Sequence, residues 1–138
     1  MSTEEKQNLP TYQDSNSVEY PQNEIEVSNF IKKFYKSNVP IELIGSGSKR
    51  KIGKPLQCSK TLSLSKINGV IEYLPEELYI KVKACTPIKQ IEEVLQKNSQ
   101  QLAFEPIDFG FFLNGNSDHG TAAGQVACNI SGPRRFKV

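Results

Sequence analysis

At 138 residues the chain is long enough for one modest domain, and 37% of its residues are hydrophobic. Its 17 basic and 15 acidic side chains leave a net charge of +2, whereas nucleic-acid-binding proteins concentrate more positive charge on one face, so nucleic acid is excluded as a partner. Three scattered cysteines and one histidine give neither a disulfide framework nor a metal site of recognised spacing, and no apolar run is long enough to span a membrane. We therefore expect a cytoplasmic protein without a bound metal.

Residues 1–23 are predicted to form a disordered tail, because they contain almost no aliphatic side chains that could be buried. A single domain is expected over residues 24–138. It should begin with an amphipathic helix, in which apolar side chains recur at intervals of three and four residues: Val27, Phe30, Ile31 and Phe34. This helix should end near Asn38, because a residue that precedes proline avoids the helical region.

Short strands and a hairpin are expected next. Alternating apolar and polar side chains around the turn Pro75–Glu77 predict an antiparallel hairpin. The strands are expected at residues 41–44, near 62 and 64, at 70–73, at 78–84 and finally at 102–104.

Two further helices complete the predicted fold. Thr86 is expected to cap the first of them, with Pro87 at its first position and an apolar stripe of Ile88, Ile91, Val94 and Leu95. The second should run from Thr121 through Ile130, after a loop at residues 105–120. The predicted class is α+β, with helices packed on a small mixed sheet.

The predicted strand 41–44 leads directly into a glycine-rich loop: Gly45, Ser46, Gly47, Ser48 and Lys49. Glycines allow positive φ, so that successive N–H groups can surround an anion, while the hydroxyls and the ammonium add donors and charge. The loop is neither a Walker loop, because Pro55 follows Gly53 and Lys54, nor a Rossmann fingerprint, because Arg50 occupies the third glycine position. By itself such a loop could equally be a turn without function.

A second glycine turn, Gly120–Gly124, precedes the last predicted helix, and helix N-termini also favour phosphate. Two turns of this kind suggest one extended diphosphate ligand that is held from two sides.

Several spaced motifs in one order carry a family resemblance. They are Gly45–Lys49, Gly53–Lys54–Pro55, the hairpin around Pro75–Leu78, Cys85–Thr86–Pro87, Glu105–Pro106, Gly120–Gly124 and Ser131–Arg135. Together they resemble the FAD-binding domain of the vanillyl-alcohol-oxidase and p-cresol-methylhydroxylase (PCMH) type, and within it the FAD-binding subunits of glycolate oxidases, over about residues 24–138.

The resemblance implies the first lobe of such a domain, with FAD as the cofactor. It assigns cofactor binding to Gly45, Ser46, Gly47, Ser48, Lys49, Glu105, Pro106, Gly120, Thr121, Ala122 and Gly124, and it assigns no catalytic residue. Attachment of FAD should be non-covalent, because covalent relatives carry a histidine where this chain has Ser48.

The resemblance also implies hydride transfer from a 2-hydroxy acid to the flavin, in an assembly with a second flavoprotein and an iron–sulfur subunit. Two departures stand out: Ala123 replaces a glycine of the family pattern, and the second flavin-binding lobe and the substrate cap do not follow. The chain alone is therefore expected to be an inactive N-terminal fragment. The alternative is a non-catalytic remnant without cofactor.

Other candidate residues remain open or minor. Arg134 and Arg135 could clamp a phosphate or could be surface charges, and His119 is expected to be a solvated loop residue. Lys49–Lys51 lacks the interleaved aromatics of a nucleic-acid patch. Cys128, among small apolar neighbours, is expected to be buried.

Overall fold

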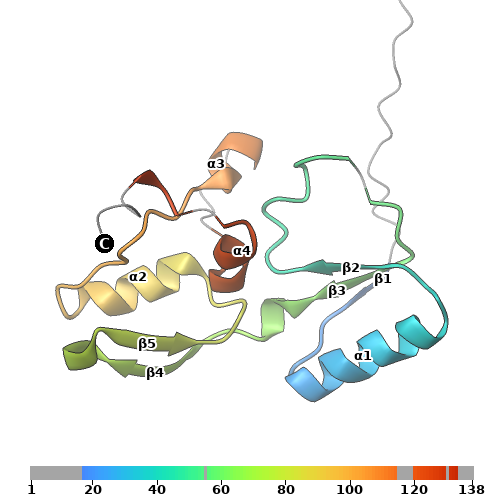
Figure 1. The fold of residues 1–138 in the computed structure, drawn as a ribbon, viewed down its shortest axis with the longest axis horizontal. Helices are drawn as coiled ribbons and strands as arrows, with labels where there is room; N and C mark the ends of the chain where they lie inside the picture. Colours follow the sequence, from blue (N-terminus) through green and yellow to red (C-terminus); the bar gives the residue numbers. More distant parts are fainter. Residues whose placement is uncertain (1–16, 55, 115–119, 130, 134–138) are drawn as a thin grey trace, which may run out of the picture.

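The computed structural model describes residues 17–54, 56–114, 120–129 and 131–133, which form two small sheets with helices around them (Figure 1). The order of elements is β1 (Ser17–Glu19), α1 (Glu24–Lys36), β2 (Ile41–Ile44), β3 (Lys60–Ser63), β4 (Val70–Leu74), β5 (Tyr79–Val82), α2 (Ile88–Gln96), α3 (Phe109–Asn114) and α4 (Ala122–Ala127). Short 3₁₀ turns follow β3 and β4, at Leu64–Lys66 and Pro75–Glu77. The α+β class predicted from the sequence is therefore confirmed. Parallel and antiparallel strands lie in separate sheets, however, rather than in one mixed sheet.

The first sheet is parallel, with strand order β1-β3-β2, and α1 lies beside it (Figure 1). The central strand β3 is the most buried, and its Leu62 is fully inaccessible. The predicted strand near residues 62 and 64 therefore exists, although Leu64 already belongs to the following 3₁₀ turn. Strand β1 corrects the predicted tail, because residues 17–19 pair with β3. The tail residues before position 17 lie outside the described part.

Helix α1 forms where its apolar spacing predicts it. The Asn23 side chain accepts a hydrogen bond from the Glu26 N–H at 3.0 Å and donates to the Glu26 carboxylate at 2.8 Å, so cap and third helical residue support each other. The helix ends at Lys36, and Asn38 adopts a φ of 52°, two residues before Pro40. No residue of α1 is buried: Val27, Phe30 and Phe34 of its apolar stripe are half-buried, and Ile31 is exposed.

The second sheet is the predicted hairpin of β4 and β5, and α2 lies against it (Figure 1). Three buried side chains of α2 form the core cluster: Ile88, Ile91 and Leu95. Partly buried side chains pack against this cluster: Tyr73, Ile80, Val82, Leu102 and Ala122. The predicted Thr86 cap is wrong. The hydroxyl of Thr86 instead donates to carbonyl oxygens of Lys83 and Gly69, and Pro87 takes the cap position without a side-chain bond.

Three further predictions about the C-terminal third need correction. Residues 102–104 form no strand, because no described strand pairs with them. Leu102 packs against the core cluster. Within the predicted loop 105–120, residues 109–114 form α3, at whose start the Asp108 carboxylate accepts the Phe111 N–H at 3.0 Å. Helix α4 ends at Ala127, before the predicted end at Ile130, which lies outside the described residues. In the part that the structure describes, no helix is long and apolar enough to cross a bilayer.

Candidate functional site

The glycine-rich loop 45–49 leaves the C-terminal end of β2 and forms one wall of a pocket of about 340 Å³. The opposite wall comes from α4 and from the turn before it. The pocket is lined by residues 42–50, by Ile52, Lys54 and Leu56, and by Thr121, Gly124, Ala127 and Cys128.

The structure brings the two glycine turns together at this pocket. A Cβ atom at Gly45 would lie 3.0 Å from the Thr121 Oγ1 atom. A Cβ atom at Gly120 would lie 3.3 Å from both the Lys49 Nζ and the Ser48 Oγ atoms. At Gly124, the Lys49 Nζ atom would be 3.9 Å from such a Cβ. The Lys49 ammonium therefore lies beside the second turn, and a Cβ atom at Gly45 or Gly120 would crowd the side chains at the place where the two turns approach each other.

Local hydrogen bonds explain how the second turn is held in place. The Ile88 N–H donates to the Gly120 carbonyl at 3.1 Å, and the Ala122 N–H donates to the Thr86 carbonyl at 3.0 Å. The Thr121 hydroxyl accepts the Gly124 N–H at 3.3 Å and so caps α4. The start of α2 thus fixes the turn against the first loop.

Backbone conformation and charge both make the pocket suitable for an anion. Gly47 and Gly120 have φ values of 79° and 75°, in the left-handed region that favours glycine. The Lys49 Nζ atom lies 5.4 Å from the centre of the Phe109 ring, which orients the ammonium. The described lining carries two further positive charges, on Lys54 and on Arg50, and the latter is paired with Glu42.

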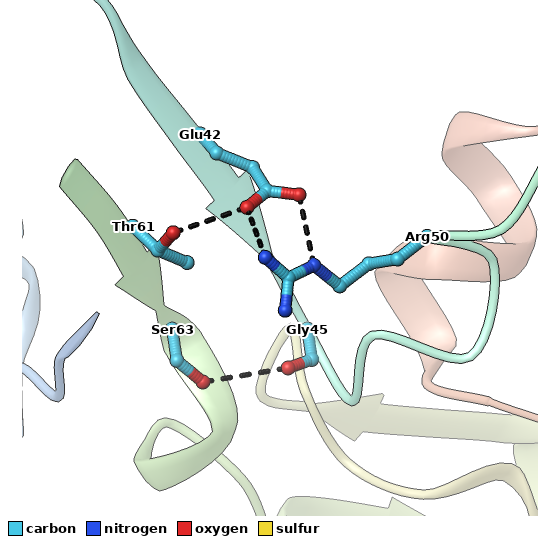
Figure 2. A network of polar contacts seen from close by, with 5 residues as sticks. All are labelled: Glu42, Gly45, Arg50, Thr61 and Ser63. Atoms are coloured by element: carbon cyan, nitrogen blue, oxygen red, sulfur yellow. Dashed lines mark hydrogen bonds and ion pairs between the residues drawn. The ribbon is translucent and has the colours of Figure 1, made fainter. Parts of the chain in front are cut away.

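The Glu42–Arg50 ion pair is part of this pocket and was not predicted from the sequence. Its two contacts measure 3.0 Å (Nε to Oε1) and 2.6 Å (Nη2 to Oε2), and the Thr61 hydroxyl donates to Oε2 at 3.0 Å (Figure 2). A sequence signal did exist, because Glu42 is the one charged residue in an otherwise apolar strand.

Several predicted site residues lie elsewhere. Ala122 packs against the core cluster, and Glu105 and Pro106 line a separate cavity of about 410 Å³ beyond the end of α2. That cavity is walled by glutamine, glutamate and apolar side chains. The sequence assigned these three residues to cofactor binding, and none of them lines the pocket beside loop 45–49. His119, Arg134 and Arg135 lie outside the described residues.

Two cysteines lie at or near the pocket, and the prediction that Cys128 is buried is wrong. Cys128 is exposed and lines the pocket, because the buried face of α4 is the one that carries Gln125. Burial raises the pKa of the Cys85 thiol above its ordinary value of 9.0, and a hydrogen bond with Thr121 partly opposes this effect. Among the described residues, no cluster of side chains could hold a metal ion.

We expect the two thiols to react at very different rates with a maleimide reagent. Cys128 should be labelled rapidly in the folded protein, and Cys85 should be labelled only after unfolding, because the thiolate is the reactive form. Mass spectrometry of labelled peptides measures both rates, and equal rates would contradict this placement.

The same pKa shift predicts alkaline destabilisation. The folded state favours the protonated Cys85 thiol, so this stabilisation is complete below the unfolded pKa and is lost as pH rises through the raised folded pKa. The free energy of unfolding should fall above about pH 9, and the fall should be shallower in Cys85→Ala, as urea titrations at several pH values would measure.

Comparison with known proteins finds a matching family model and a curated relative. A family model described as FAD binding domain matches residues 16–138. The chain is 35% identical over 96 residues to glycolate oxidase subunit GlcE of Escherichia coli (strain K12), an alignment that covers 70% of this chain and 25% of that protein.

Solved structures of similar fold include alkyldihydroxyacetonephosphate synthase in two crystal forms. The TM-scores are 0.61 and 0.59 at 21% and 18% identity, over 83% of this chain and 22% and 20% of those chains. The chain therefore spans about a quarter of the curated relative and about a fifth of the synthase. The family predicted from the spaced motifs is confirmed: the chain belongs to the FAD-binding domain family.

Proposed function

We propose that this chain holds the pyrophosphate of FAD, as part of a flavin-dependent oxidoreductase that acts on a 2-hydroxy acid. The observation that carries the proposal is the meeting of loop 45–49 with the turn 120–124, with the Lys49 ammonium beside that turn. Backbones without Cβ atoms allow a phosphate to approach closely, and the nearby cation balances its charge.

The residues present fit a diphosphate group. In the proposed complex, the backbone and hydroxyls of Gly45–Ser48 hold one side of the pyrophosphate, and Thr121 and Gly124 close the other. Lys49 supplies the opposing charge. Glu105, Pro106 and Ala122 have no part in this proposal, because they line or pack against other regions.

The substrate class rests on the glycolate oxidase subunit that the chain resembles, since glycolate is a 2-hydroxy acid. Bound flavin would supply the hydride acceptor, and the residues described here would bind and orient it. That relative is named as a subunit, which supports an assembly with other chains, proposed to be a second flavoprotein and an iron–sulfur subunit. We place this assembly in the cytoplasm, as the scattered cysteines suggest. The competing proposal is a non-catalytic remnant that binds no flavin.

Ligand titration of the purified 138-residue polypeptide tests the proposal. We expect saturable but weak FAD binding, weaker than micromolar, because contacts from only part of a site must offset an association cost of about 4–15 kcal/mol. Inorganic pyrophosphate should compete with FAD and riboflavin should not, since the proposed contacts are to phosphate. Lys49→Gln should weaken binding, whereas Lys51→Gln removes the same charge from an exposed neighbour outside the pocket and serves as the control. Absence of FAD binding would favour the remnant.

The polypeptide alone should show no turnover of glycolate or lactate with an artificial electron acceptor, because it spans only a quarter of its curated relative. Submicromolar FAD affinity together with measurable turnover would mean that these 138 residues form a complete enzyme. In that case the proposal of a partial site would be wrong.

We also propose that FAD attachment is non-covalent, because the first loop carries Ser48 at the position of the attachment histidine of covalent relatives. The exposed thiol of Cys128 lies in the same pocket, so Cys128→Ser is the control for attachment of flavin to this thiol. Acid precipitation of flavin-loaded protein should release all the yellow colour, in the parent chain and in Cys128→Ser alike. A yellow pellet from the parent chain would contradict the proposal.

A further inference from the structure

Strand β2 buries its acid and exposes its leucine. Glu42 is 5% exposed, whereas the next residue, Leu43, is 56% exposed. Since a buried carboxylate is costly unless it is paired and hydrogen-bonded, this inverted pattern needs a specific reason. The reason lies in the partners of Glu42, which are Arg50 and the fully buried Thr61 on the adjacent strand (Figure 2).

The ion pair closes the ends of the first glycine loop. Glu42 precedes the loop on β2 and Arg50 follows it, so their two-pronged contact spans residues 45–49. The Arg50 side chain passes close to the loop itself, because a Cβ atom at Gly47 would lie 3.2 Å from the Arg50 Cδ atom. The Arg50 N–H also donates to the Gly47 carbonyl at 3.1 Å.

A further contact ties the loop to β3. The Ser63 hydroxyl lies 3.5 Å from the Gly45 carbonyl oxygen, at the outer limit of a hydrogen bond (Figure 2). Through Thr61 and Ser63, the central strand of the parallel sheet therefore contacts both the ion pair and the start of the loop.

We propose that Arg50 is a positioning residue: its paired contact with Glu42 holds loop 45–49 in the shape that binds the pyrophosphate, and Arg50 is not itself a phosphate ligand. The inference rests on the proposed function and assigns a task within it. Two of the Arg50 donor nitrogens are already engaged by one carboxylate, and the planar guanidinium makes a contact that the single ammonium of lysine cannot reproduce.

The two possible roles of Arg50 predict opposite results for Glu42→Gln. If Arg50 bound phosphate directly, loss of the neighbouring negative charge would strengthen anion binding. If the pair positions the loop, Glu42→Gln should weaken binding, because the loop must then be ordered at the moment of binding. Arg50→Lys separates the roles again, since it keeps the charge and loses the two-pronged contact.

The experiment measures dissociation constants for FAD and for inorganic pyrophosphate at two or more salt concentrations, with thermal unfolding as the check of folding. We expect Arg50→Lys and Glu42→Gln each to weaken both ligands about tenfold or more, equivalent to the ordering of one or two loop residues. The double variant should bind both ligands little more weakly than either single variant, because the two substitutions remove the same contact. In Arg50→Lys, which keeps the charge, the salt dependence of the affinity should stay as in the parent chain, whereas Lys49→Gln should reduce it.

Lys51→Gln is the matched control, because it removes a charge beside Arg50 from an exposed side chain and should leave both affinities unchanged. Parent-chain affinity in Arg50→Lys, or tighter binding in Glu42→Gln, would overturn the inference. Loss of folding in both variants would also overturn it, since the pair would then be a requirement of the fold. If the parent chain bound neither ligand, the proposed function itself would fail, which is a separate result.

Discussion

Gly47→Val should lower the affinity for FAD at least about a hundredfold, which is about 2.7 kcal/mol, while the fold persists. Gly47 has a φ of 79°, where a β-branched residue is strained by about 1–3 kcal/mol. Its new side chain would also press on Arg50, whose Cδ atom lies 3.2 Å from the added Cβ position. Strain relief and displacement of Arg50 would both deform the loop that is proposed to hold the pyrophosphate.

Gly53→Val is the matched control for this variant. Gly53 has a φ of 84°, so the backbone strain is similar, but apart from its chain neighbours no atom of the described residues lies within 4 Å of its Cβ position. Gly53→Val should therefore lose a comparable amount of stability and keep its FAD affinity. Titration with FAD and urea unfolding of both variants measure the two effects. Parent-chain affinity in Gly47→Val would disprove the assignment of the loop.

Leu62→Ala should reduce the free energy of unfolding by about 2–5 kcal/mol, a large part of the total stability of a small domain. Leu62 is fully buried in the central strand β3, and truncation would leave a cavity between the parallel sheet and the elements around it. Strand β2, which pairs with β3, leads directly into the glycine loop, so FAD affinity should fall as well.

Leu43→Ala is the control for packing, because Leu43 lies opposite Leu62 in the strand register and is 56% exposed. This variant should change the stability by only about 0.5 kcal/mol. Urea unfolding of both proteins gives the comparison. Equal losses of stability would mean that the centre of the parallel sheet is not where the structure places it.

The sequence by itself determined the elements that depend on neighbouring residues. The apolar spacing after Glu24 was sufficient for α1, and period-two alternation was sufficient for the hairpin of β4 and β5. The glycine pattern located loop 45–49, because positive φ at Gly47 is a local requirement that few other residues meet. The family followed from the order of several such motifs.

Only the tertiary structure decided what depends on distant partners. Residues 17–19 have no pattern of a buried strand, and they form β1 because β3, about 40 residues later, offers a parallel edge. The small residues of α4 have no apolar periodicity that would show which face of the helix is buried, and the prediction that Cys128 is buried was wrong. Gln125 faces inward instead, where its side-chain amide donates to the Ile107 carbonyl at 3.1 Å. Glu42 is buried for the same kind of reason, because its partners Arg50 and Thr61 meet it only in the folded chain. A local pattern fixes backbone conformation, whereas the buried face of a short element is chosen by the surface that packs against it.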